Sequence, residues 1–219
     1  MDNRVNFHQS LDNLQQDLLT MGIQVEHLIH QAVESLSKLD ENLAIQTIKQ
    51  DDAIDEMTAR IEEDSMRLIA LQQPMASDLR IISMALKIAT DLERIADHAV
   101  DIAKITIRLN GQELVKPLED IPRMAQMTKA MLRESLLAYT ERNVHRAASL
   151  AEKDDEVDKL YSVVINDVIA LMGDDLARNR QLSQLMLAAH FLERVADHST
   201  NIGEGVIFMV TGKRKDLNM

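Results

Sequence analysis

The feature that most constrains this fold is the length over which apolar residues repeat at helical spacing without a break. The first stretch sets the pattern, with apolar side chains at Leu11, Leu14, Leu18, Met21, Val25 and Leu28. Only three prolines and six glycines interrupt 219 residues, and five aromatic residues are too few for a typical strand-rich core. The sequence therefore predicts an all-α protein of long helices packed on one another.

The prolines, glycines and candidate capping residues divide the chain into six helices of roughly 30 residues each. These helices are expected to begin near Phe7, Asp40, Pro74, Pro122, Asn143 and Asp174. Asp40 is a candidate N-cap, and Asn110–Gly111 is a candidate left-handed stop for the third helix. Helices this long favour an antiparallel bundle.

The two halves of the chain are copies of each other. Residues 92–98 read LERIADH and residues 192–198 read LERVADH, a seven-residue match with one exchange at a shift of 100. QDDAID at 50–55 aligns with KDDEVD at 153–158 at a shift of 103, and in both halves this motif comes before the LER motif. This duplication predicts two tandem, pseudo-symmetric three-helix bundles. Their expected bounds are 1–111 and 121–212, with a linker at 112–120 and a basic tail at 213–219.

Net charge and composition exclude several classes of function. A formal net charge of −12 argues against nucleic acid and anionic membrane surfaces as partners. With no cysteine, the chain forms no disulfide, thiolate metal site or cysteine nucleophile. No signal peptide and no membrane-spanning run is apparent, so we expect a cytoplasmic location without membrane insertion. Phosphate-binding loops and nucleophile motifs are absent too, which disfavours an enzyme.

Acidic residues form stripes beside the apolar seam of the helices. At 100° per residue, Glu93, Asp97 and Asp101 lie within 80° of one another, next to the apolar face of their helix. Asp51 and Asp55 hold a comparable position on the preceding helix, and both stripes recur in the second half. Two such helices packed side by side would direct their carboxylates into one shared space.

Three interpretations of these stripes are open. They are solvated helix flanks in a structural scaffold, a metal site in a signalling adaptor, or a di-metal carboxylate centre in a helical-bundle enzyme. Repeated like charges four residues apart destabilise a helix by roughly 0.2–0.5 kcal/mol per pair, and oxygen-ligated cations relieve such repulsion. Lys104 could neutralise Asp101, but the equivalent residue in the second half is Glu204. We therefore favour metal binding, with His98 and His198 either as ligands or as interhelical hydrogen-bonding groups.

The repeated LER[IV]ADH segment, with Asn201–Ile202 after the second copy, resembles the signature of the PhoU family. The resemblance extends to ALQQPMASDLR at 70–80, to both DDxxD stretches and to Val210–Gly212. It implies two three-helix bundles and a non-enzymatic role as a negative regulator of phosphate uptake and phosphate-starvation genes. The implied partners are the ATPase of a phosphate ABC transporter and a sensor histidine kinase, and a homodimer is expected.

The resemblance also implies metal ions, either iron or zinc clusters or magnesium and manganese. Carried over position by position, the first site would use Asp51, Asp55, Glu93, Asp97 and Asp101. The second site would use Asp154, Asp158, Glu193, Asp197 and Asn201. Asn201 stands where the first half has Asp101; its amide oxygen can still ligate a cation but adds no charge. The two sites are therefore expected to differ in affinity or nuclearity.

Overall fold

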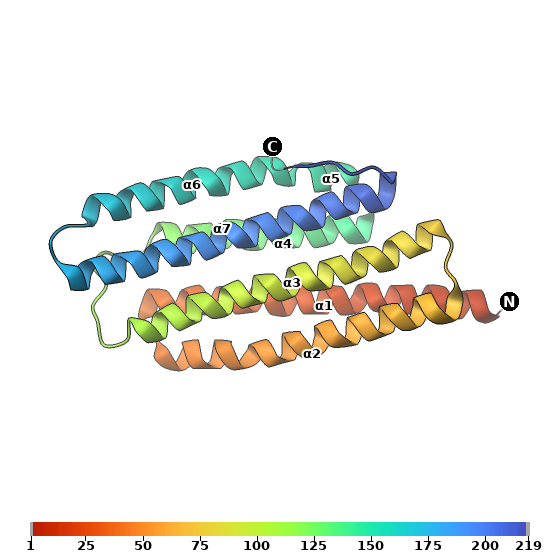
Figure 1. Cartoon of the computed structure of the whole chain (residues 1–219), viewed down its shortest axis with the longest axis horizontal. Helices are drawn as coiled ribbons and strands as arrows, with labels where there is room; N and C mark the ends of the chain where they lie inside the picture. The colour runs from red at the N-terminus through yellow and green to blue at the C-terminus, as the bar shows by residue number, and fades with distance from the viewer. Residues whose placement is uncertain (1, 218–219) are drawn as a thin grey trace.

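A computed structural model describes residues 2–217, and within that range the chain is helical with no β-strand. The helices are α1 (Asp2–Lys38), α2 (Glu41–Gln72), α3 (Ala76–Arg108), α4 (Asp120–Glu141), α5 (Val144–Ala148), α6 (Leu150–Leu171) and α7 (Leu176–Thr211). They lie roughly parallel or antiparallel along one long axis (Figure 1). The prediction of an all-α bundle is confirmed.

Several predicted helix boundaries are confirmed by their capping geometry. The Asp40 carboxylate accepts a hydrogen bond from the backbone N–H of Leu43 at 3.0 Å and begins α2. Asn143 and Asp175 cap α5 and α7 in the same way. Gly111 has φ of +75°, a left-handed conformation that glycine adopts without strain.

Three boundaries differ from the prediction. Pro74 lies before α3 rather than in its first turn, because Met75 is extended and serves as the N-cap. The fourth helix begins at Asp120, which places Pro122 within its first turn. The fifth helix is interrupted at Ser149, whose hydroxyl donates to the carbonyl of Arg146. Such local side-chain bonds to the backbone compete with regular helix pairing.

The core forms where the apolar stripes of the helices meet. All six apolar residues that set the pattern in the first helix are buried, from Leu11 to Leu28. In the first half α1, α2 and α3 pack on one another, and in the second α4, α6 and α7 do so. The halves join along α3 and α7 and along α1 and α4 (Figure 1).

One contact between the halves depends on a glycine. A Cβ atom built on Gly22 of α1 would lie 2.2 Å from Cδ1 of Leu136 on α4. The missing side chain therefore lets the Leu136 side chain pack directly against the α1 backbone.

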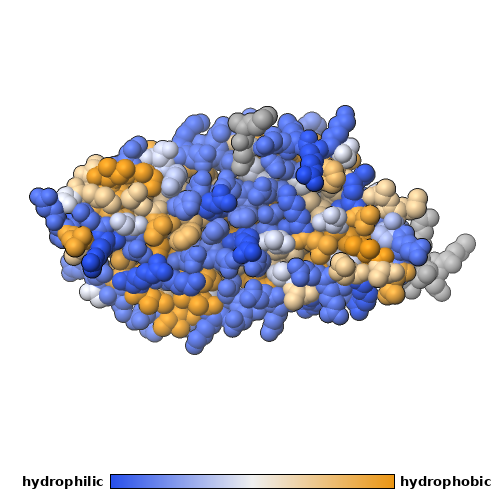
Figure 2. Space-filling view, in the orientation of Figure 1, coloured by the Kyte–Doolittle hydropathy of each residue, from blue (hydrophilic) through white to orange (hydrophobic). Residues whose placement is uncertain are grey.

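The face of the molecule shown in Figure 2 is mainly hydrophilic in its middle and carries hydrophobic patches toward both ends of the long axis. Leu71 and Met75, beside the α2–α3 turn, are 70% and 76% exposed. Leu176, beside the α6–α7 turn, is 64% exposed. None of the helices within residues 2–217 has the length and apolar character needed to cross a membrane.

Candidate metal sites in the two carboxylate clusters

The first carboxylate cluster lies where α2 packs against α3. Burial is the main cause that raises the pKa of Asp51 to about 6, and the negative charges of Asp55, Asp97 and Glu93 add to it. The pKa of Glu93 is raised as well, again chiefly by burial, although Arg94 opposes the shift. Charges from two helices thus act on one another across the α2–α3 seam, as the sequence predicted.

The second cluster lies where α6 packs against α7. Asp154 is only 6% exposed, and burial followed by the charges of Asp158 and Asp197 raises its pKa to about 6. Burial also raises the pKa values of Asp158 and Glu193, and the negative charge of Asp197 raises both further. The two halves therefore repeat the same electrostatic arrangement, in which one aspartate on α2 or α6 is desolvated among neighbouring carboxylates.

Basic residues on the same helices partly neutralise both clusters. Nη1 of Arg94 donates to Oδ2 of Asp97 at 3.0 Å, and Nη1 of Arg194 donates to Oδ2 of Asp197 at 2.6 Å. Lys104 pairs with Asp101 at 3.0 Å, the neutralisation that the sequence suggested for the first half. These pairs hold three candidate ligands in ion pairs with residues three positions away on their own helix.

As the side chains lie, no group of three or more histidine or acidic residues within residues 2–217 is arranged to hold a metal ion. The predicted ligands fall into two kinds. Four acidic residues in each half act on one another across a helix seam: Asp51, Asp55, Glu93 and Asp97, and Asp154, Asp158, Glu193 and Asp197. Asp101 instead pairs with Lys104, and Asn201 accepts a hydrogen bond from Lys87 through its backbone carbonyl.

The donor set nevertheless suits a cation bound through oxygen. Oε2 of Glu193 is buried and has no hydrogen-bond partner among the described residues, although Nδ1 of His190 lies 3.4 Å away. A buried, unpaired carboxylate oxygen is costly unless a donor or a cation satisfies it. Oxygen-only donors favour magnesium, manganese or iron(III) over zinc, which more often takes nitrogen and sulfur ligands. Arg94 and Arg194 each bond to Oδ2 of the aspartate and would compete with a cation for that oxygen.

Two residues next to the second cluster had no signal in the sequence. The Thr200 hydroxyl donates to Oδ1 of Asp154 at 3.3 Å. The pKa of Tyr161 is raised, first by burial and then by the charge of Glu193. Thr200 is on α7 and Asp154 is on α6, 46 residues apart. No local spacing pattern links them, and only the packing of the two helices brings them together.

The duplicated histidines meet between the two halves in unequal environments. Nδ1 of His198 lies 3.0 Å from Oδ1 of Asp91, which joins α7 to α3. His98 stacks on Phe191 with ring centroids 5.6 Å apart, and burial lowers its pKa to about 4. The two histidine rings are 5.7 Å apart. The sequence left these histidines as either metal ligands or interhelical hydrogen-bonding groups, and His198 forms the interhelical hydrogen bond.

These features define a class: an all-α protein of duplicated three-helix units, with a cluster of carboxylates along one helix seam of each unit. The family model described as the PhoU domain matches residues 18–106 and 121–206. The chain therefore belongs to the PhoU family, as the repeated motif indicated.

Relatives of this family match over nearly the whole chain. The phosphate-specific transport system accessory protein PhoU homolog of Clostridium acetobutylicum is 44% identical over 213 residues, which cover 97% of each chain. The homolog of the same name in Streptococcus pneumoniae is 33% identical and covers 98% of this chain and 100% of its own.

Two solved structures show the same architecture. The crystal structure of PhoU from Pseudomonas aeruginosa has a TM-score of 0.89 at 33% identity and covers 94% of this chain and 100% of its own. The crystal structure of the phosphate transport system regulatory protein PhoU from Streptococcus pneumoniae has a TM-score of 0.88 at 31% identity, with coverage of 96% and 99%.

Proposed function

We propose that this protein is an accessory regulator of a phosphate transport system and restrains phosphate-starvation genes when phosphate is plentiful. The observation that carries the proposal is near full-length similarity to proteins named phosphate-specific transport system accessory protein. In this role it contacts the ATPase of a phosphate ABC transporter and a sensor histidine kinase. By binding one conformation of a partner better than another, it shifts the equilibrium between them.

The proposed role is non-enzymatic, because the relatives are named as accessory proteins. Two cavities of about 500 Å³ are lined by other residues, and neither contains a carboxylate of the two clusters. Metal chemistry on a substrate would need a reacting atom held in a pocket beside the metal.

The regulatory role is tested in a strain that lacks this protein. In phosphate-replete medium the deletion strain is expected to express alkaline phosphatase and other phosphate-scavenging genes that the parent keeps repressed. Normal repression together with normal phosphate uptake would contradict the proposal. Where the genome encodes a second family member, the double deletion is the strain to compare, because one copy can substitute for the other.

The second part of the proposal is that each carboxylate cluster binds metal ions. The first site is Asp51, Asp55, Glu93, Asp97 and Asp101, and the second is Asp154, Asp158, Glu193, Asp197 and Asn201. A bound divalent or trivalent cation supplies positive charge that offsets the repulsion among these groups. Binding to the folded state alone stabilises it by about 2.7 kcal/mol when free metal is at a hundredfold excess over Kd.

The metal sites are tested by a double variant with a matched control. Asp97→Ala with Asp197→Ala removes the mid-stripe carboxylate of each half, whereas Asp52→Ala with Asp155→Ala removes two exposed aspartates on α2 and α6. We expect only the first pair to lose bound metal by elemental analysis and to lose the rise in melting temperature on metal addition. If both double variants bind as much metal as the parent protein, the clusters are ordinary helix flanks.

The homodimer expected for the family remains a prediction. Sedimentation equilibrium of the purified protein measures it directly, since the monomer mass is 24.8 kDa.

A further inference from the structure

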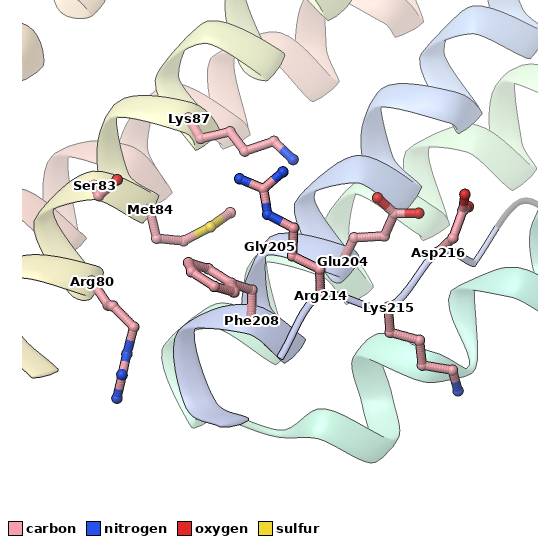
Figure 3. A pocket seen from close by; sticks show the side chains of 10 residues that line it. All are labelled: Arg80, Ser83, Met84, Lys87, Glu204, Gly205, Phe208, Arg214, Lys215 and Asp216. Carbon is pink, nitrogen blue, oxygen red and sulfur yellow. The ribbon is translucent and has the colours of Figure 1, made fainter. Parts of the chain in front are cut away.

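A basic pocket lies between the two halves, and no carboxylate of the two clusters lines it. It has a volume of about 500 Å³ and is formed by the first half of α3, the last part of α7 and the C-terminal tail (Figure 3). Its lining includes Arg80, Lys87 and Arg214, with Phe208 and Met84 as an apolar wall. This concentration of positive charge stands out in a chain of net charge −12.

Two of these cations have no carboxylate partner within residues 2–217. Lys87 and Arg214 both extend into the same space (Figure 3), and neither forms an ion pair with an acidic residue of that range. Nζ of Lys87 is 3.4 Å from the backbone carbonyl of Asn201, and the Arg214 guanidinium lies 5.7 Å from the centroid of the Phe208 ring. Glu204 and Asp216 also line the pocket, as does a fourth basic residue, Lys215. Oε1 of Glu204 accepts the backbone N–H of Leu217 at 2.9 Å, and the lining as a whole has four basic and two acidic side chains.

The positions related to this pocket by the internal repeat carry basic residues that do have partners. At a shift of 100 residues, Lys87 is replaced by Leu187. At the same shift, the pocket residues Glu204 and Phe208 correspond to Lys104 and Arg108 of α3. Lys104 pairs with Asp101, and Arg108 donates a hydrogen bond to Gln184. Lys104 and Arg108 thus have polar side-chain partners within the chain, unlike Lys87 and Arg214 among the described residues. Bringing two unpaired cations into one cavity is unfavourable unless an anion joins them.

A glycine shapes the wall of this pocket. A Cβ atom built on Gly205 would lie 2.2 Å from Cε and 2.3 Å from Sδ of Met84. Met84 is only 4% exposed and packs where that side chain would be. Any larger residue at position 205 must therefore displace Met84 from the pocket wall.

We propose that this pocket binds the phosphate group of a small molecule between Lys87 and Arg214. Guanidinium and ammonium groups donate charge-assisted hydrogen bonds to phosphate oxygens, and arginine can do so with two parallel bonds. The volume lies in the range of pockets for small organic ligands, so there is room for more than the phosphate itself. At physiological salt the Debye length is about 8 Å, so acidic residues outside the pocket contribute little to its potential, and within the lining the basic side chains outnumber the acidic ones by four to two.

Isothermal titration calorimetry with inorganic phosphate and with adenosine monophosphate tests the proposal. A chelator is present throughout, so that binding does not depend on the metal sites. We expect saturable binding of at least one probe, and an affinity about tenfold or more lower in Lys87→Gln and in Arg214→Gln. The probe with the higher affinity shows whether the pocket prefers free phosphate or an organic phosphate.

Two further variants make the result specific. Lys213→Gln makes the same change in charge on the same tail but outside the pocket lining, and it is expected to bind like the parent. Gly205→Ala leaves every charge in place and is expected to weaken binding by moving Met84, with circular dichroism confirming that it is folded. No binding of either probe to the parent, or an equal loss in Lys213→Gln, would overturn the proposal.

Discussion

Replacing Asp154 by asparagine is predicted to make the metal-free protein more stable at neutral pH. Asp154 is 6% exposed, and its pKa is raised to about 6 by burial and by the charges of Asp158 and Asp197. Because the folded-state pKa lies above the unfolded value near 4, the stabilising form is the protonated one. Its contribution is complete below about pH 4 and is lost as the pH rises through 6.

The size of the effect follows from the two pKa values. The difference between about 4 and about 6 corresponds to roughly 3 kcal/mol between the protonated and ionised forms. Asparagine keeps the volume of the side chain and an acceptor for the Thr200 hydroxyl but carries no charge. We therefore expect Asp154→Asn to raise the free energy of unfolding at pH 7.5 by about 1–3 kcal/mol. Each kcal/mol corresponds to about 2–4 °C in melting temperature for a chain of this size.

The assay is urea or thermal unfolding in chelator at pH 7.5 and again at pH 4. At pH 4 the parent is expected to match the variant, because Asp154 is then protonated. Asp155→Asn, one residue along on the exposed side of α6, is the control and should change stability by less than about 0.5 kcal/mol. Equal stability of the parent and Asp154→Asn at pH 7.5, or an equal gain in the control, would refute the electrostatic reasoning.

Two other substitutions test contacts between the halves. His198→Leu leaves the buried carboxylate of Asp91 without its partner and is expected to lower the free energy of unfolding by about 2 kcal/mol. His98→Leu, where the ring packs on Phe191, is expected to lower it by less than half of that. Equal losses in urea unfolding would show that the Asp91 contact has no special role. Gly22→Leu is expected to cost about 1–3 kcal/mol because its side chain must displace Leu136, while Gly173→Leu, where a Cβ atom would meet open space, should be nearly neutral. An unchanged melting temperature for Gly22→Leu would contradict the close packing of α1 on α4.

The sequence by itself determined that the chain is helical, how many long helices it forms and that its two halves are duplicated. Apolar periodicity depends only on the local 3.6-residue repeat, so it identified buried positions such as Leu18 and Leu28. Capping is also local, which is why Asp40 was identified as an N-cap. The start of α3 was placed wrongly, because proline suits the first turn of a helix but equally suits the extended segment before one.

The sequence also placed acidic stripes beside the packing seam, but it did not distinguish the members of each stripe. Asp154 and Asp155 are neighbours of the same type, yet one is buried and the other exposed, because only one faces α7. The direction in which Arg94 and Arg194 turn, toward Asp97 and Asp197, likewise depends on side-chain conformations that residue spacing does not determine.

Only the tertiary structure decided which distant residues meet. The Asp91–His198 hydrogen bond joins residues 107 positions apart, and the basic pocket combines α3 with the tail at the other end of the chain. Helical periodicity reports which face of a helix is apolar, but not which other helix covers that face or at what height along the bundle. Those choices arise from packing over the whole chain, where a missing side chain at Gly205 and a long one at Met84 fit together.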